Sequence, residues 1–596
     1  MGILTMAEPM NKEAIVAYFS MEIALEPDIP TYSGGLGVLA GDTVRSAADL
    51  GIPLVAVTLL YRKGYFYQRI DEGGRQIEEP VHWVMEDHLD ELAQRVAVMI
   101  ENRVVSIRSW RYHVEGVTGF TVPVYLLDTD LDENAEDDKR LTDYLYGGDQ
   151  RYRLCQELIL GIGGARMLEA LGYLGIRRFH MNEGHAALLT LELLERRAKK
   201  CGNRSVTGKD IEAVRKKCIF TTHTPVPAGH DQFPMELMSR IISEAERRWD
   251  INDVRVMGVL NHILCVPDKI SDLKELSQTD SPVNMTLLAL NLSHYVNGVA
   301  KRHGEIARLM FAEYAIHSIT NGVHGVTWTS DSFRRLYDQY IPGWRQDNLA
   351  LRYALSIPAD EIWNAHMEAK KELIDYVNRE TNAGMSTDAF TVGFARRAAT
   401  YKRGDLFVSD PERLRKIVDR TGQIQLVCAG KAHPKDQGGK DVIARIWHAK
   451  EVLGEAIKIS YLPNYDMAMG KLITSGVDLW LNTPVPPLEA SGTSGMKAAL
   501  NGVPSLSVLD GWWIEGWIEG VTGWSIDKDL RDKQEAYDSS RDAALLYEKL
   551  EKVIMPLFYK DRRGFVNVML HCVAVNGSFF NTHRMMQQYV MHAYLL

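Results

Sequence analysis

Five short apolar segments, separated by connections of helical length, constrain the fold of this chain more than any other feature. They are residues 391–395, 424–429, 457–462, 477–481 and 505–509. Parallel strands need a crossover connection that is usually a helix, and the connections here run to roughly 15–30 residues. The second half of the chain is therefore predicted to be an α/β fold built on a parallel sheet.

The first half shows the same alternation less regularly. Residues 15–20 and 53–60 are predicted strands on either side of a helix that runs through Leu50. Further along, we expect strands and turns over 66–150, a helix over 151–171, a strand over 218–223, a long amphipathic helical region over 285–315, and a helix after 576–583. The acidic run at 132–138 is predicted to be a solvated loop.

The composition is that of an ordinary soluble globular protein. Hydrophobic residues make up 46% and charged residues 24% of the 596 residues, and the net charge of −10 is spread along the chain. No basic patch indicates a nucleic-acid partner. No apolar run approaches the roughly 18 residues of a membrane-spanning helix, and residues 1–13 lack a signal-peptide core. We expect a cytoplasmic protein without a membrane partner.

The cysteines and histidines indicate neither disulfides nor a metal centre. The six cysteines have no paired spacing and are predicted to be reduced thiols; they are Cys155, Cys201, Cys218, Cys265, Cys428 and Cys572. His180, Glu183 and His185 follow one predicted strand, but a further ligand at a suitable spacing is missing. No metal is predicted.

A glycine-rich loop between two predicted strands carries a lysine. The stretch opens with Glu489, continues as Ser491-Gly492-Thr493-Ser494-Gly495, and enters a helix-forming run that contains Lys497. Unpaired N–H groups at a helix start attract anions, and ligands of open α/β sheets bind at the carboxyl ends of strands. The stretch is predicted to hold a phosphate beside an amine. A capped loop with a solvated lysine is the alternative.

A second glycine loop follows the first predicted strand. Gly35, Gly37 and Ala40 match the dinucleotide fingerprint formally, but the next strand runs into Tyr61-Arg62-Lys63 instead of ending in an acidic residue. A loop for a different phosphate fits better, and a plain strand-to-helix turn stays open.

A basic cluster ends the strand at 391–395. Arg396, Arg397, Lys402 and Arg403 lie within eight residues of one another and repel unless anions satisfy them. A solvated face is the usual explanation for such a run. Its place at the carboxyl end of a strand favours bound phosphates instead.

These motifs together resemble the α-glucan phosphorylases, which act on glycogen, starch and maltodextrins. The run from Glu489 to Lys497, with Leu500-Asn501-Gly502 and Leu509-Asp510-Gly511 after it, is similar to the segment in which that family's lysine carries pyridoxal 5'-phosphate as a Schiff base. The basic cluster is similar to the family's [K/R]-R-x-x-x-Y-K-R. The resemblance extends from Gly34 to His583, in a short form of the family.

The resemblance implies roles for individual residues. For the cofactor they are Lys497, Arg396 at its phosphate, Thr493, Ser494, Gly495, Tyr465, Trp328 and Gly35. For the substrates they are Arg397 and Lys402 at the phosphate, and Gly34, Gly35, Glu183, His185, His223, Asn321, Tyr401, Glu489, Ser491 and Gly492 around the phosphate and sugar. The sequence departs from the longer enzymes at Arg396, at Ala399 in place of histidine, and at Ser494-Gly495 in place of Gly-Asn.

The resemblance also implies an architecture and a reaction. We expect two Rossmann-like lobes of the glycosyltransferase-B type, 1–322 on the glucan side and 323–596 on the cofactor side, with the active site in the cleft between them. The last helix, about 578–596, would pack back on the first lobe. The implied reaction is the reversible phosphorolysis of α-1,4-glucans by inorganic phosphate to α-D-glucose 1-phosphate, with retention.

Two other functions stay open at this point. One is a nucleotide-sugar-dependent glucan synthase of the same architecture, and the other is a non-catalytic glucan-binding protein. The resemblance leaves homo-oligomer formation open. Because the stretch before Gly34 is shorter than the regulatory region of the animal enzymes, we expect hyperbolic kinetics in phosphate and little response to AMP.

Overall fold

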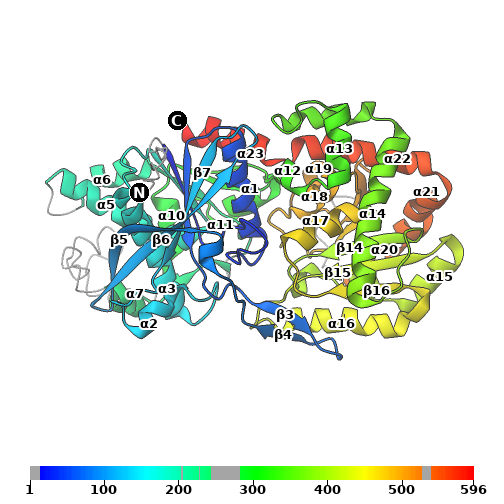
Figure 1. Cartoon of the computed structure of the whole chain (residues 1–596), viewed down its shortest axis with the longest axis horizontal. Coiled ribbons are helices and arrows are strands. Elements are labelled where there is room, and N and C mark those ends of the chain that lie inside the picture. Colours follow the sequence, from blue (N-terminus) through cyan, green and yellow to red (C-terminus); the bar gives the residue numbers. More distant parts are fainter. Residues whose placement is uncertain (1–13, 203–205, 227–228, 243–281, 527–537, 596) are drawn as a thin grey trace, which may run out of the picture.

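The computed structural model describes residues 14–202, 206–226, 229–242, 282–526 and 538–595. Figure 1 shows two α/β halves side by side, one built on a sheet from the first part of the chain and one on a sheet from the second part. The C-terminal helical segment lies over the first half.

The sheet of the second half has six parallel strands in the order β16-β15-β14-β17-β18-β19. They are β14 (Phe390–Ala395), β15 (Ile424–Ala429), β16 (Lys458–Leu462), β17 (Leu479–Asn482), β18 (Ser505–Ser507) and β19 (Gly523–Ser525). Counted within this sheet the order is 3-2-1-4-5-6, which is the Rossmann order. The five predicted strands are confirmed, whereas the Gly-Trp-Ser of β19 has no strand pattern and was not predicted.

The sheet of the first half has nine strands in the order β13-β12-β9-β8-β1-β2-β7-β6-β5. They are β1 (Val16–Ser20), β2 (Leu54–Leu59), β5 (Asp90–Ile100), β6 (Arg103–Glu115), β7 (Thr121–Asp128), β8 (Arg178–Asn182), β9 (Cys218–Thr221), β12 (Tyr295–Gly298) and β13 (Ile316–Ser318). From β7 to β13 all neighbours are parallel, and β6 and β5 add an antiparallel edge. The parallel part again runs outward in both directions from its first strand. The predicted α/β class with two Rossmann-like sheets is confirmed.

Helices cover both faces of each sheet. In the first half they are α1 (Gly35–Asp49), α2 (Glu136–Lys139), α3 (Gln150–Leu158), α4 (Gly164–Ala170), α5 (Leu189–Lys200), α6 (Gly208–Arg215), α7 (Met235–Ile242), α10 (Met285–Asn291) and α11 (Lys301–Met310). In the second half they are α12 (Gly325–Trp328), α13 (Asp331–Tyr340), α14 (Ala359–Thr381), α15 (Pro411–Thr421), α16 (Gln437–Leu453), α17 (Met467–Gly476), α18 (Ser494–Leu500), α19 (Trp513–Gly516), α20 (Ser539–Lys549), α21 (Met555–Lys560) and α22 (Arg562–His571). The last helix, α23 (Thr582–Tyr589), packs on α1 of the first half.

The central strands are buried on both faces. Every residue of β1, β2, β14 and β15 is buried, as expected for parallel strands with helices above and below. Separate apolar clusters lie on the two faces of the first sheet. Two more pack around the second sheet.

Two expectations about local structure were wrong. The region 285–315 is not one helix, because β12 lies between α10 and α11 and fills the sheet between β9 and β13. A buried strand this short cannot be told from a helical turn by periodicity. The acidic run is not wholly solvated either. Asp138 in α2 is buried, and its carboxylate accepts two hydrogen bonds from the Arg103 guanidinium, at 2.8 and 2.9 Å.

The cysteines that the structure describes are free thiols, as predicted. Cys155, Cys218, Cys428 and Cys572 are buried and Cys201 is exposed. Cys265 lies outside the described residues.

Two chain segments connect the halves and lie side by side. Val323 bridges to Asn581, and its carbonyl accepts a hydrogen bond from the Thr582 N–H at 3.0 Å. Beyond this pair, α23 packs on α1, where the Ser46 and Thr582 hydroxyls lie 2.6 Å apart. The extent of each lobe stays a prediction, but these contacts attach the end of the chain to the first sheet.

A hairpin of the first half reaches the second. It consists of β3 (Tyr67–Ile70) and β4 (Gln76–Glu79), which lie beside α16 in Figure 1. The amides of Gln68 and Gln76 donate to the carbonyls of Gly430 and Ala432, both at 2.9 Å. Buried amide–backbone bonds of this kind give the contact a defined register.

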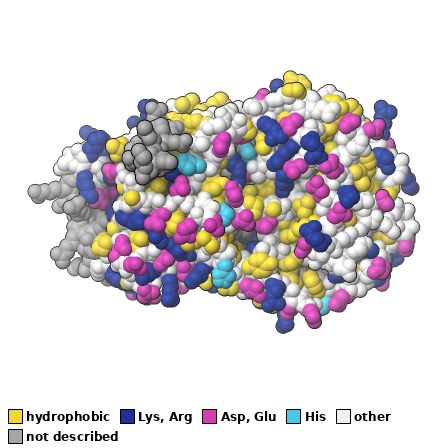
Figure 2. All heavy atoms as spheres, viewed as in Figure 1, with side chains coloured by type: hydrophobic (Ala, Val, Ile, Leu, Met, Phe, Trp, Pro, Cys, Tyr) yellow, Lys and Arg dark blue, Asp and Glu magenta, His cyan; other side chains and the backbone are white. Residues whose placement is uncertain are grey.

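The visible surface mixes acidic and basic side chains without a large area of one sign (Figure 2). Among the described helices, none combines the length and the apolar composition needed to cross a membrane.

Candidate active site

Several candidate site residues follow the strands at which the strand order of each sheet reverses. In the first sheet these are β1 and β8, which Glu22 and Glu183 follow closely. In the second they are β14 and β17, and Arg396 and Arg397 directly follow β14. Loops that diverge from such a point leave room for a ligand at the carboxyl ends of the strands.

The first glycine loop is open at its start and tightly packed behind it. A Cβ on Gly34 or Gly35 would meet no atom within 4 Å. A Cβ on Gly37 would come within 2.6 Å of Tyr32, and one on Gly41 within 2.0 Å of the Ala24 carbonyl oxygen. Packing therefore explains the later glycines but not the first two, whose open backbone lets a ligand approach.

A carboxylate already contacts this loop. Glu22 is buried and accepts hydrogen bonds from the backbone N–H of Ser33 at 2.6 Å and of Gly34 at 3.2 Å. It also accepts from the Tyr146 hydroxyl at 2.8 Å. Glu22 thus fixes the loop that precedes α1, while the helix itself begins at Gly35.

The second glycine loop is held from several sides. The Glu489 N–H donates to Asp510 at 2.9 Å, and the Ser491 carbonyl accepts from the Trp512 N–H at 2.9 Å. Gly492 has a φ of +70°, which favours glycine. A Cβ on Gly495 would come within 2.9 Å of the Trp512 ring. These contacts fix the path of the backbone into α18.

Lys497 lies in α18 with its amine against an aromatic ring. Its Nζ is 3.5 Å from the centroid of the Trp328 ring, and the residue is 6% exposed. Burial lowers the pKa of the Lys497 amine to about 8, although the Asp42 carboxylate acts to raise it. A lysine with a lowered pKa carries more neutral amine near pH 7 and can react with a carbonyl group.

Two other predicted cofactor residues lie close to this amine. A Cβ on Gly470 of α17 would be 2.9 Å from the Tyr465 hydroxyl and 3.6 Å from the Trp328 ring. Tyr465 and Trp328 therefore border the same glycine, next to Lys497.

Two cations of the basic cluster converge on one carboxylate oxygen. Arg396 and Lys402 donate to Glu489 Oε2 at 2.7 and 2.8 Å. Burial acts to raise the pKa of Glu489, but the two cations overcome it and hold the pKa at about 2. Arg396 keeps two buried donors, Nε and Nη1, without a hydrogen-bond partner in the described part of the chain. Unpartnered buried donors of this kind can bind an anion.

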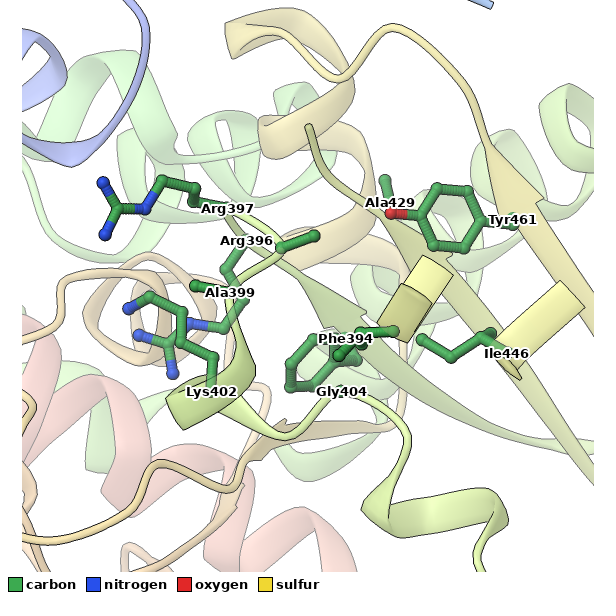
Figure 3. A pocket seen from close by; sticks show the side chains of 11 residues that line it. Phe394, Arg396, Arg397, Ala399, Lys402, Gly404, Ala429, Ile446 and Tyr461 are labelled. Carbon is green, nitrogen blue, oxygen red and sulfur yellow. The ribbon is translucent and has the colours of Figure 1, made fainter. Parts of the chain in front are cut away.

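The third cation of the cluster points elsewhere. In Figure 3 the Arg397 side chain lies apart from that of Lys402. Arg397 is exposed, whereas Arg396 and Lys402 are buried. Tyr401 lies beside Lys402, whose Nζ is 4.8 Å from its ring centroid. Ala399, at the position of the expected histidine, is buried and begins the turn that carries Tyr401.

The predicted sugar residues of the first half follow β8, β9 and β13. Glu183 has a φ of +72°, a strained backbone for a residue with a side chain. Its carboxylate accepts from the His223 N–H at 2.7 Å and from the Thr224 hydroxyl at 3.1 Å. His185 Nε2 lies 3.3 Å from an Asp231 oxygen. Asn321 is buried, and its Oδ1 has no hydrogen-bond partner in the described residues.

Sequence reasoning missed several polar residues around this cluster. Arg153 stacks on Tyr146 with 4.5 Å from Cζ to the ring centroid, and it donates to Asp231 at 2.9 Å. A path of contacts thus runs from Glu22 at the glycine loop to His185. None of these residues belongs to a glycine or basic motif, but the place of Glu22 directly after the first strand is a signal that could have found it.

Histidines that could be considered as metal ligands make hydrogen bonds with protein groups. His180 is buried between the hydroxyls of Tyr594 and Thr221, each 2.8 Å away. Among the described residues, Asp49, His324 and His583 form the one cluster with metal-like spacing. His324 Nδ1 accepts from the Thr327 N–H, so its Nε2 carries the proton that it donates to Asp49 at 2.7 Å. This is a hydrogen-bonded arrangement.

Comparisons with known proteins agree with these motifs. A family model described as carbohydrate phosphorylase matches residues 17–122 and 175–523. The chain is 38% identical to the maltodextrin phosphorylase of Thermococcus litoralis over 97% of this chain and 70% of that protein. It is 37% identical to a glycogen phosphorylase of Mycobacterium tuberculosis over 100% of this chain and 72% of that protein. It is also 34% identical to the glycogen phosphorylase of Aquifex aeolicus, over 98% and 87% respectively.

Proposed function

This chain belongs to the carbohydrate phosphorylase family, and we propose that it catalyses the reversible phosphorolysis of α-1,4-glucans to α-D-glucose 1-phosphate. The observation that carries the proposal is that the loop leading to Lys497 and the cationic cluster follow adjacent strands, β17 and β14, and that Glu489 of this loop pairs with Arg396 and Lys402. A buried amine and a group of cations on adjoining loops provide one place for a carbonyl-bearing cofactor and another for phosphate.

The cofactor that these residues fit is pyridoxal 5'-phosphate, attached to Lys497. Trp328 and Tyr465 would cover it, Thr493, Ser494 and Gly495 would line its phosphate together with Gly35, and the unpartnered donors of Arg396 would bind that phosphate. When bound, the cofactor would supply a phosphate group that exchanges a proton with the substrate phosphate.

The substrate phosphate would bind between the two halves of the site. Arg396, Lys402 and Glu489 together carry one net positive charge, so an anion is attracted even while the carboxylate is in place. Arg397 adds an exposed cation, and Gly34 and Gly35 offer open backbone. Preorganised donors of this kind stabilise charge that develops during reaction.

The glucan would bind through the remaining predicted residues. Tyr401, Glu489, Ser491 and Gly492 lie on the second half of the chain, and Glu183, His185, His223 and Asn321 on the first. Once phosphate shares the two cations, the carboxylate of Glu489 becomes available to accept from sugar hydroxyls. The cleft that would hold the sugar between the halves stays part of the proposal.

The charge state of Glu489 supports the phosphate route over ordinary glycoside hydrolysis. Hydrolases use a carboxylic acid that protonates the leaving oxygen, which requires a raised pKa. The pKa of Glu489 is held at about 2, so it is ionised near neutral pH and is a poor general acid. The phosphate itself would protonate the glycosidic oxygen and then attack the same face, with retention of configuration.

The direct test is formation of glucose 1-phosphate from maltodextrin and inorganic phosphate by the purified protein loaded with pyridoxal 5'-phosphate. We expect product without any nucleotide. A nucleotide-sugar synthase would instead extend glucan from a sugar nucleotide and give no glucose 1-phosphate. A non-catalytic binding protein would retain the glucan without converting it. Either result would contradict the proposal.

A further inference from the structure

One helix links the first glycine loop to the cofactor lysine. α1 begins at Gly35 in that loop, and Asp42 lies two turns further along with a fully buried side chain. Asp42 Oδ2 accepts a hydrogen bond from the Trp328 indole N–H at 2.7 Å and from the His324 N–H at 3.1 Å. The carboxylate of the first half thus fixes an indole and a backbone group of the second.

The indole that Asp42 holds is the ring that contacts the amine. Lys497 Nζ lies 3.5 Å from the centroid of the Trp328 ring. The Asn501 side chain also donates to the Trp328 carbonyl at 2.9 Å, one turn of helix after Lys497. Asp42, Trp328 and Lys497 therefore form a continuous series of contacts from the first half of the chain into α18.

The second carboxylate oxygen of Asp42 has little to balance its charge. Its Oδ1 is buried and makes no hydrogen bond in the described part of the chain. The nearest cation is Arg45, whose Nη1 lies 3.6 Å from Oδ1 and whose guanidinium is committed to the carbonyls of Ala24 and Leu25. A buried carboxylate with so little local compensation acts strongly on other charges nearby.

We propose that Asp42 is a positioning residue for Lys497: through Trp328 it holds the indole against the amine, and with its own charge it favours the ammonium form of that lysine. The role assigned to Lys497 rests on the proposed function. The action of Asp42 on the amine does not, because it depends only on contacts within the chain.

The proposal makes the reactivity of Lys497 depend on the other half of the molecule. With Asp42 ionised, the amine is kept protonated to higher pH than burial alone would allow. With an uncharged residue at position 42, nothing would oppose the lowering of the Lys497 pKa by burial. A larger fraction of the Lys497 amine would then be neutral at pH 7.

The test measures the protonation of Lys497 directly in the full-length chain without added cofactor. Trace acetic anhydride is applied between pH 6 and pH 10, and the modification of Lys497 is quantified by peptide mass mapping against Lys209, an exposed lysine of α6. In the wild-type protein the midpoint should fall at about pH 8. In Asp42→Asn it should fall by about one unit, which at pH 7 raises the rate at Lys497 about fivefold.

The pH profile separates the charge effect from simple exposure of the lysine. Loss of the indole contact alone would expose the amine to solvent and raise its midpoint, because burial is what lowers the pKa of Lys497, and that result would overturn the proposal. Asp42→Glu retains the charge, so its midpoint should stay near the wild-type value. A midpoint as low as that of Asp42→Asn would count against the charge of Asp42.

A second variant should shift the midpoint of Lys497 in the opposite direction, and it tests the proposal even if Asp42→Asn does not fold. Arg45→Gln removes the nearby cation, so the carboxylate should act more strongly and the midpoint of Lys497 should rise. An unchanged or lowered midpoint would overturn the proposal. Because no cofactor is present in the assay, a wild-type protein that never takes up pyridoxal 5'-phosphate would refute the proposed function and leave this result interpretable.

Discussion

The amine of Lys497 lies 3.5 Å from the centroid of the Trp328 ring, although the two residues are far apart in the sequence. Trp328 ends α12, directly after the segment that connects the halves of the molecule, and Lys497 lies in α18 behind the second glycine loop. The contact places the candidate cofactor site next to the connection between the halves. The properties of the candidate cofactor site should therefore depend on residues of both halves of the molecule.

The phosphate cations should be separable from the cofactor site by mutation. Arg397→Ala and Lys402→Ala each remove one donor proposed for the substrate phosphate, so kcat/KM for phosphate should fall about 100- to 1,000-fold. Cofactor content, measured by absorbance after release, should stay near the wild-type value. Lys371→Ala, which removes an exposed cation of α14, is the control and should leave both unchanged. Normal phosphate kinetics in either variant would remove that residue from the proposed site.

Two of the glycines in α1, Gly35 and Gly41, should respond to substitution in opposite ways. Gly35→Ala adds a Cβ to open space, so the free energy of unfolding should stay within about 0.5 kcal/mol of wild type while phosphate binding weakens. Gly41→Ala would place its Cβ 2.0 Å from the Ala24 carbonyl oxygen and should cost about 1–3 kcal/mol. Urea unfolding and phosphate kinetics distinguish the two. A destabilised Gly35→Ala protein would mean that this glycine serves packing.

Acid should weaken the protein through Glu489. Its pKa is about 2 in the folded state against an ordinary 4.5, so its contribution to stability is complete above pH 4.5 and is lost as the pH falls toward 2. That contribution corresponds to about 3 kcal/mol. Glu489→Gln lacks it, so the difference in unfolding free energy between the two proteins should shrink over this range. A difference that does not change with pH would show that the two cations do not stabilise the ionised form.

The same variant should respond more strongly to phosphate. Glu489→Gln leaves Arg396 and Lys402 buried without their counter-charge, which costs about 3 kcal/mol in the absence of another anion. Inorganic phosphate should restore part of that loss, so the rise in Tm with phosphate should exceed that of the wild-type protein. Equal shifts in the two proteins would indicate that phosphate binds away from these cations.

A buried ion pair away from the site provides a structural reference. Asp478 accepts from Lys370 at 2.6 Å, from His366 at 2.8 Å and from the Thr391 N–H at 2.7 Å, and its side chain is fully buried. Asp478→Ala should cost about 3–5 kcal/mol, because it leaves the buried Lys370 ammonium without its counter-charge. Thermal unfolding checks this. A loss below about 1 kcal/mol would mean that solvent reaches the pair.

Much of the second half could be predicted from sequence because its strands are continuous apolar runs separated by helices. Such runs identify buried parallel strands directly, as at Phe390–Ala395 and Ile424–Ala429. The short strands Tyr295–Gly298 and Gly523–Ser525 could not be predicted in this way. They owe their conformation to the neighbours that they pair with, and no local pattern encodes that pairing.

The candidate site also has a part that could be predicted from the sequence and a part that could not. Lys497 and the basic cluster stand in motifs whose composition indicates anion binding, so their neighbourhood could be predicted. Asp42 could not, because it acts through a tertiary contact with the Trp328 indole. Glu22 was missed as well, although its place after the first strand is a usable signal. The separation of Arg397 from Lys402 could not be predicted either, since spacing along the chain does not set where a long side chain lies.

The central claim is that Lys497 holds pyridoxal 5'-phosphate in a protein that cleaves glucan with phosphate. The most direct measurement is reduction of the purified, active protein with borohydride, which makes the bond between cofactor and lysine permanent, followed by peptide mass mapping. The account predicts a pyridoxyl group on the peptide that contains Lys497 and loss of the label in Lys497→Ala. A label on a different lysine, or no label on protein that still forms glucose 1-phosphate, would contradict it.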